Sequence, residues 1–149
     1  MSQARAIVLM LGCLTACKSG SSNRAPEGSP EQLARAFLRD VESGDDTAGY
    51  AKLCRGYANG VSKPSFARAV QSNAYLHAAP KLNFANASMQ AGGWSVSGPL
   101  ETTLGSVGIE VHGGTEEPQR LCISGILLGG TPVLPTPGAL VQGTVIDGG

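Results

Sequence analysis

The sequence predicts an α+β domain in which three helices near the start pack on one face of an antiparallel sheet of about four strands. Apolar residues recur every three or four positions up to about residue 76, which is the period of a helix. From Lys81 they alternate with polar residues, which is the period of a strand. The 21 glycines among 149 residues suit tight hairpins and a strongly bent sheet.

The first helix has a clear start and end in the sequence. Ser29 suits the capping position, Pro30 suits the first helical position, and Gln32 completes a capping box. An apolar stripe follows at four-residue steps, and Gly44 ends the helix. The stripe consists of Leu33, Phe37 and Val41, joined by Ala34 and Leu38.

Two further helices are expected before residue 77. Asp45 and Asp46 cap a second short helix that continues through Tyr50, Leu53 and Cys54. The third helix is predicted over 62–72, with its apolar residues on one side. Those residues are Phe66, Ala69 and Val70, with Tyr75 and Leu76 packing just past the end.

Four strands are predicted from alternating apolar residues. Gly98-Pro99 and residues 113–118 are interpreted as breaks between strands. The apolar positions, strand by strand, are Leu82 and Phe84; Trp94 and Val96; Val107, Ile109 and Val111; and Leu121 and Ile123 with 126–128. We expect Trp94, the only tryptophan, to fill the core.

The segment 129–149 is predicted to be a Gly/Pro-rich tail. Its three prolines keep the first half out of a central strand. Residues 139–146 form either a last edge strand or a loosely ordered end, and we favour the second. The predicted domain therefore spans 30–128.

The start of the chain has the pattern of an export signal. Residues 6–16 form an uncharged run that is too short to span a bilayer as a helix. The run ends in Leu14-Thr15-Ala16-Cys17, which resembles a bacterial lipobox, in which the cysteine thiol carries the lipid. We predict a signal peptide over 1–16, lipidation at Cys17 and a flexible tether over 17–29. We prefer Cys17 to Cys13 as the lipidated residue, because cleavage at Cys13 would leave a shorter apolar core in the signal peptide. The alternative to a lipoprotein is an ordinary signal peptide that contains a cysteine by chance.

These features place the protein in the bacterial cell envelope, anchored to a membrane by lipid, with its domain facing the periplasm or the exterior. Eleven Lys and Arg balance eleven Asp and Glu without a basic cluster, which argues against nucleic acid as a partner.

Cys54 and Cys122 remain as a pair in an exported chain. A disulfide between them would close a loop of about 69 residues and stabilise the fold by about 4 kcal/mol at most. A pair of buried thiols and a metal or redox site are the alternatives. Neither CxxC nor HxxxH occurs, so we expect no metal site and no cofactor.

No catalytic motif stands out. His77 is a weak candidate for a general base, because no acidic residue lies near it in sequence to orient it. Tyr50 and Tyr57 are weak candidates for an acid at a pocket mouth, since a tyrosine on a helix is usually core with a polar tip. We expect Glu110 and His112 to lie on the solvated face of the sheet.

Three segments together resemble the lipoproteins of the nuclear transport factor two-like superfamily. They are Gln32-Leu-Ala-Arg-Ala-Phe-Leu38, Ser43-Gly-Asp-Asp46 and Tyr50-Ala-Lys-Leu-Cys54. The resemblance covers roughly 30–128 and implies an α+β cone, with three helices in the hollow of a curved sheet. It also implies that Cys54 meets Cys122 on a late strand. That superfamily contains isomerases, dehydratases, ligand carriers and partner-binding domains, so the fold leaves the activity open.

The sequence thus favours a non-enzymatic envelope lipoprotein whose tethered domain binds a protein partner or a small apolar ligand. The alternative is an enzyme of the isomerase or dehydratase type with an acid or base in the cone pocket.

The intact mass of protein purified from membranes tests the anchor and the cross-link together. We expect a chain that starts at Cys17 and carries acyl groups, with Cys54 and Cys122 alkylated only after reduction. An unlipidated chain with two freely alkylated thiols would contradict both predictions.

Overall fold

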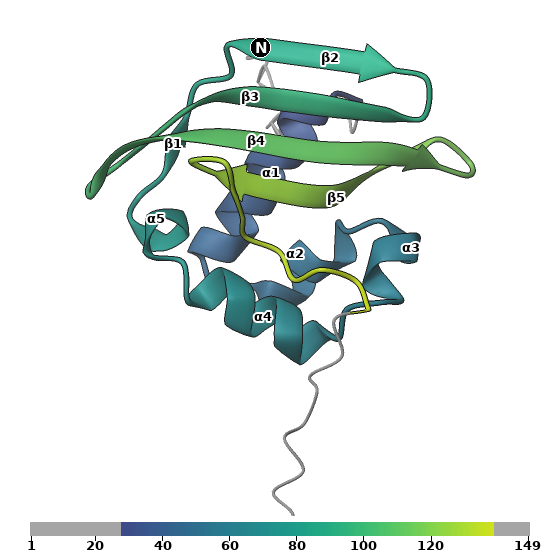
Figure 1. Cartoon of the computed structure of the whole chain (residues 1–149), viewed down its shortest axis with the longest axis horizontal. Helices are drawn as coiled ribbons and strands as arrows, with labels where there is room; N and C mark the ends of the chain where they lie inside the picture. The colour runs from purple at the N-terminus through teal and green to yellow at the C-terminus, as the bar shows by residue number, and fades with distance from the viewer. Residues whose placement is uncertain (1–27, 139–149) are drawn as a thin grey trace, which may run out of the picture.

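A computed structural model describes residues 28–138. The fold is α+β, as predicted, with five helices followed by a six-stranded antiparallel sheet (Figure 1). The sequence predicts three helices and about four strands, and the additional elements are short. The signal peptide 1–16, Cys17, most of the tether and residues 139–149 lie outside the described residues.

Helix α1 (Pro30–Glu42) begins and ends where the sequence predicts. The Ser29 hydroxyl accepts a hydrogen bond from the Gln32 backbone N–H at 3.2 Å. Gly44 has a φ of +77°, a left-handed conformation that glycine adopts without steric cost. The buried side of the helix is Ala34, Phe37, Leu38 and Val41.

The predicted second helix is shorter than expected. Helix α2 (Asp46–Ala51) is capped by Asp45, whose carboxylate accepts from the Ala48 backbone N–H at 2.9 Å. Leu53 instead forms an isolated parallel bridge with the sheet, and Cys54 starts the one-turn helix α3 (Arg55–Ala58). Backbone pairing with the sheet therefore interrupts the helical apolar pattern at this point.

The predicted third helix is present as α4 (Lys63–Gln71), capped by Ser62. It is followed by a single extra turn, α5 (Ala74–His77), which the Asn73 carboxamide caps. Leu76 in this turn is fully buried, whereas Tyr75 is partly exposed.

The sheet order is β1-β3-β4-β5-β6, and β2 pairs with β3 on the same side as β1. All of these pairings are antiparallel. The strands are β1 (Lys81–Leu82), β2 (Asn86–Gln90), β3 (Gly93–Thr102), β4 (Gly105–Glu116), β5 (Arg120–Leu128) and β6 (Thr131–Pro132).

Strand β2 is absent from the prediction because its sequence, NASMQ, contains only one large apolar residue, Met89. The expected strand through Phe84 is wrong beyond Leu82, because residues 83–85 cross from β1 to β2. Gly98-Pro99 was expected to separate strands and instead lies inside β3. It faces that crossing, and a Cβ on Gly98 would lie 2.0 Å from the Asn83 carbonyl oxygen.

Residues 113–116 also lie inside a strand, β4, rather than in a break. A bulge shifts the register after His112, because His112 pairs with Gly125 and Gly113 pairs with Ile123. Ser124 is therefore left without a partner in β4. The bulge puts Ile123 and Ile126 on the same inward face, although they are three residues apart. Cys122, the neighbour of Ile123, is also fully buried.

The helices cover one face of the sheet, and the core lies between them. Phe37 and Phe66 meet edge to face at 6.1 Å between ring centroids. The sheet contributes Trp94, Val96, Leu100, Ile109, Val111, Ile123 and Ile126 to this core. The other face, called the open face below, carries Ser95, Ser97, Glu110 and His112.

The fold continues past Leu128 into the predicted tail. Strand β6 pairs with the end of β5, and Pro132 lies on this edge strand, where its missing N–H costs little. Leu134 is buried against the core. The chain then passes over α3, where a Cβ on Gly60 would lie 2.9 Å from the Pro137 Cβ.

Replacement of Gly113 should be costly, because backbone and a ring both lie against it. A Cβ there would lie 2.1 Å from the Cys122 carbonyl oxygen and 2.2 Å from the Trp94 ring. We expect Gly113→Ala to lower the free energy of unfolding by about 3 kcal/mol, measured by urea denaturation.

Gly108→Ala is the matched control, because no atom lies within 4 Å of a Cβ at that position of the same strand. It should change stability by about 0.5 kcal/mol or less. Equal effects of the two substitutions would show that close packing at Gly113 is not the constraint.

Candidate functional site

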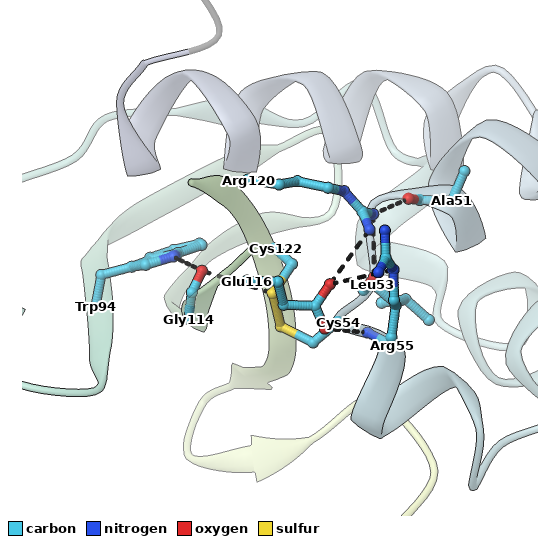
Figure 2. Close-up of a disulfide and its surroundings, with 9 residues drawn as sticks. All are labelled: Ala51, Leu53, Cys54, Arg55, Trp94, Gly114, Glu116, Arg120 and Cys122. Atoms are coloured by element: carbon cyan, nitrogen blue, oxygen red, sulfur yellow. Dashed lines mark hydrogen bonds and ion pairs between the residues drawn. A yellow bond between two sulfur atoms is a disulfide. The ribbon is translucent and has the colours of Figure 1, made fainter. Parts of the chain in front are cut away.

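The most densely bonded polar cluster in the described residues surrounds a disulfide between Cys54 and Cys122 (Figure 2). These are the two cysteines that lie outside the predicted signal peptide and lipidation site. Cys122 is fully buried and Cys54 is half-buried. Three charged side chains lie beside it: Arg55, Glu116 and Arg120. We refer to these five residues as the disulfide junction.

Backbone pairing brings the two cysteines together. The Cys54 N–H donates to the Ile123 carbonyl at 2.8 Å, and the Ile123 N–H donates to the Lys52 carbonyl at 2.9 Å. This places the connection between α2 and α3 alongside β5 as a one-residue parallel strand. The disulfide therefore reinforces a contact that hydrogen bonds already make.

Glu116 closes the junction from the neighbouring strand. Its carboxylate accepts from the Arg55 backbone N–H at 2.5 Å and lies 3.4 Å from Nη1 of Arg120. Arg120 in turn donates to the carbonyls of Ala51 and Leu53. Arg120 thus binds two carbonyls near the end of α2, and Glu116 satisfies the N–H at the start of α3.

The geometry of the junction brings two sulfurs and one carboxylate oxygen within 4.8 Å of one another. Metal ions bind the thiolate, and in the disulfide both sulfurs are covalently joined to each other. The carboxylate is also already paired with two arginines. In the oxidised state the cluster is therefore a structural cross-link.

Glu116 and Arg120 are absent from the predicted site, because residues 113–118 were expected to form a break and Glu116 lies within them. The sequence does contain a signal for their pairing, because Glu116 and Arg120 carry opposite charges and lie on the two sides of Pro118, where the chain is expected to turn. In the structure these two residues are directly paired across the hairpin between β4 and β5.

Tyr50 and Tyr57 both use their hydroxyls to hold backbone. The Tyr50 hydroxyl lies 2.7 Å from the Val61 carbonyl and 2.9 Å from the Ala58 carbonyl. Its ring packs edge to face on Phe66 at 5.6 Å. The Tyr57 hydroxyl donates to the Pro135 carbonyl and so ties the end segment to α3. These bonds favour a structural role for both tyrosines.

Burial raises the pKa of Tyr57 from 10.0 to about 12, and the nearby Tyr50 adds to the rise. A hydroxyl with this pKa keeps its proton across the physiological range. An acid or base needs a pKa nearer the working pH, so this shift runs against a catalytic role.

The structure does not bring His77 together with the tyrosines. It lies in α5, whereas Tyr57 lies in α3, at the other side of the helical layer (Figure 1). The His77 side chain is exposed, and its Nε2 lies 3.1 Å from the Val70 carbonyl oxygen. This contact ties α5 back to the end of α4.

The remaining polar candidates lie where the sequence predicted. Glu110 and His112 form an exposed pair on the open face, with 3.2 Å between Oε1 and Nε2. Asp45 caps α2, and Asp46 accepts a hydrogen bond from Gln71. Trp94 is buried in the core and donates to the Gly114 carbonyl at 3.1 Å.

Two open grooves lie on the surface of the described residues. One has a volume of about 390 Å³ and is lined by α1 and β1, including Arg35, Arg39 and Glu42. The other, of about 350 Å³, lies over the middle of β3 and β4 beside the end of β5, and half of its lining residues are glycine. Neither groove is lined by Tyr50, Tyr57 or His77.

None of the protein-family models, curated proteins or solved structures compared with this chain matches it. In the part of the chain that the structure describes, no helix is both long enough and apolar enough to cross a membrane.

The raised pKa of Tyr57 predicts a pH-dependent stability. In the unfolded chain this hydroxyl ionises near pH 10, whereas in the folded chain it stays protonated to about pH 12. The contribution is fully present below pH 10 and is lost as the pH rises from 10 to about 12.

We therefore expect Tyr57→Phe to be about 1 kcal/mol less stable than the natural chain at pH 7, because the Pro135 carbonyl loses its donor. This difference should shrink as the pH rises above 10, measured by denaturation at a series of pH values. Tyr75→Phe, at an exposed ring, is the control and should keep the natural pH profile. A pH-independent difference for Tyr57→Phe would contradict the assignment.

Proposed function

We propose that this protein is a non-enzymatic bacterial envelope lipoprotein, attached to a membrane through lipid on Cys17, whose domain binds a protein partner. The observation that carries the proposal is the run Leu14-Thr15-Ala16-Cys17 directly after an uncharged apolar segment. The Cys54–Cys122 disulfide supports it, because such cross-links persist in oxidising compartments outside the cytoplasm.

The contacts of the three candidate acid–base residues support a binding role over the isomerase or dehydratase alternative. Tyr50, Tyr57 and His77 each contact a backbone carbonyl that links two elements of the fold. Such positions explain their presence without catalysis.

A protein partner is favoured over a small apolar ligand. The inward side chains of the sheet pack directly against the helices in one continuous core. The two surface grooves described above are open and partly polar, whereas pockets for small ligands are mostly enclosed and apolar.

We also propose that the fold is the α+β cone of the nuclear transport factor two-like superfamily. Five helical segments precede the three long antiparallel strands β3, β4 and β5, and they cover a single face of the sheet. The bulge between β4 and β5 supports a curved sheet, since bulges bend the strand that contains them.

Complementation of a deletion strain tests the functional proposal. The strain would carry the natural chain, Cys17→Ala, His77→Ala or Tyr50→Phe, and its envelope phenotype and membrane fraction would be measured. We expect Cys17→Ala to leave the membrane fraction and fail to complement, because the anchor is lost. His77→Ala and Tyr50→Phe should remain in the membrane fraction and complement fully.

Circular dichroism controls for folding in each variant. A folded, membrane-bound His77→Ala or Tyr50→Phe variant that fails to complement would instead support the enzymatic alternative. Full membrane retention of Cys17→Ala would contradict the lipid anchor.

A further inference from the structure

The groove between α1 and β1, called the α1–β1 groove below, carries an excess of positive charge. It is lined by the second half of α1 and by the segment 80–83, which contains β1. Leu38 and Leu82 are its buried lining residues, and the charged ones are exposed. The charged residues are three cations, Arg35, Arg39 and Lys81, and one carboxylate, Glu42.

Arg35 is already held in place on this groove by contacts within the protein. Its Nη1 donates to the Leu82 carbonyl at 2.6 Å. Its guanidinium also lies over the Phe84 ring, 5.0 Å from the ring centroid. A guanidinium has five N–H donors, so this hydrogen bond leaves most of them for a ligand. A side chain that is fixed beforehand loses little conformational entropy on binding, which favours affinity.

Arg35 and Arg39 lie one helical turn apart, and both line the groove. Like charges at this spacing repel each other and destabilise a helix. The ion pairs described within residues 28–138 involve neither of these guanidiniums. An anion bound between the two arginines would remove this repulsion.

We propose that the α1–β1 groove binds a phosphate group, with Arg35 and Arg39 as its main contacts. A planar guanidinium matches phosphate oxygens with two parallel N–H···O bonds. Lys81 adds a third positive charge from β1, although Glu101 lies opposite it in the sheet and balances part of that charge.

The charge of the groove favours phosphate over a carboxylate. Three cations and one carboxylate give its lining a net charge of +2. A phosphate monoester carries about two negative charges near neutral pH, whereas a carboxylate carries one. The open shape of the groove also suits a charged group, because the molecule that carries the phosphate can extend into solvent.

Two sources offer this group: a soluble phosphorylated molecule and the headgroup of a phospholipid. Both present the same phosphate oxygens to the arginines. The proposal depends neither on the lipid anchor nor on a protein partner, so its failure would leave the proposed function standing.

Titration of the full chain with inorganic phosphate, followed by NMR at constant ionic strength, tests the site. The backbone amide signals of α1 and β1 should shift and saturate, with a Kd on the order of 1 mM. Arg39→Gln should weaken binding about tenfold, because a charge-assisted hydrogen bond is lost. Glu42→Gln should strengthen it about threefold, because a repelling charge is removed.

Arg68→Gln is the matched control, since it removes the same charge from an exposed position on α4 outside the groove. It should leave the Kd unchanged. Equal losses for Arg39→Gln and Arg68→Gln would show a general charge effect and overturn the proposal. So would a natural chain whose α1 and β1 signals do not respond. Circular dichroism confirms the fold of each variant.

Two organic phosphates distinguish the sources in the same titration. Glycerol 3-phosphate represents a soluble monoester, and dihexanoylphosphatidylglycerol represents a phospholipid headgroup on chains short enough to stay dissolved. Both should shift the groove signals, and the tighter one identifies the source. Binding of inorganic phosphate without either organic phosphate would overturn the proposal, because the groove would then hold only an adventitious ion.

Discussion

The rest of the structure depends on the attachment of the α2–α3 connection to strand β5. One parallel bridge between Leu53 and Ile123 converts the end of a helical segment into an extension of the sheet. The Cys54–Cys122 bond fixes that contact covalently across 68 residues of sequence. Such a cross-link reduces the conformational freedom of the unfolded chain, so it acts most strongly where helices and sheet are distant in sequence. Glu116 and Arg120 then satisfy the backbone groups that the interrupted helix leaves unpaired.

A second constraint acts within the sheet itself. The Trp94 ring lies across Gly113, where any side chain would collide with it. The register shift next to Gly113 lets Ile123 and Ile126, which are three residues apart, both face the core. Bulges of this kind change the facing of side chains without breaking the strand. The packing of the tryptophan and the position of the disulfide are therefore coupled through one glycine.

The functional proposals divide the molecule into parts with separate tasks. In the proposed function, the anchor at Cys17 would hold the domain at a membrane, and the disulfide would reinforce the fold in an oxidising compartment. Tyr50, Tyr57 and His77, which first appeared as possible acid–base groups, hold backbone segments together. In the proposed role, the surface left for recognition would be the polar open face of the sheet, and partner binding there would not require a reactive group.

The sequence by itself determined the fold class, the capped starts of α1, α2 and α4, and the face on which Glu110 and His112 lie, because these depend on residues that are close together along the chain. Only the tertiary structure decided where the second helix stops, why Gly98 and Gly113 lie inside strands, and how Glu116 contributes to the junction. Each of these depends on a backbone or ring that arrives from elsewhere in the chain. The sequence did not predict strand β2 for a related reason. Both of its faces are largely exposed and it contains only one large apolar residue, Met89, so its pairing with β3 alone makes it a strand.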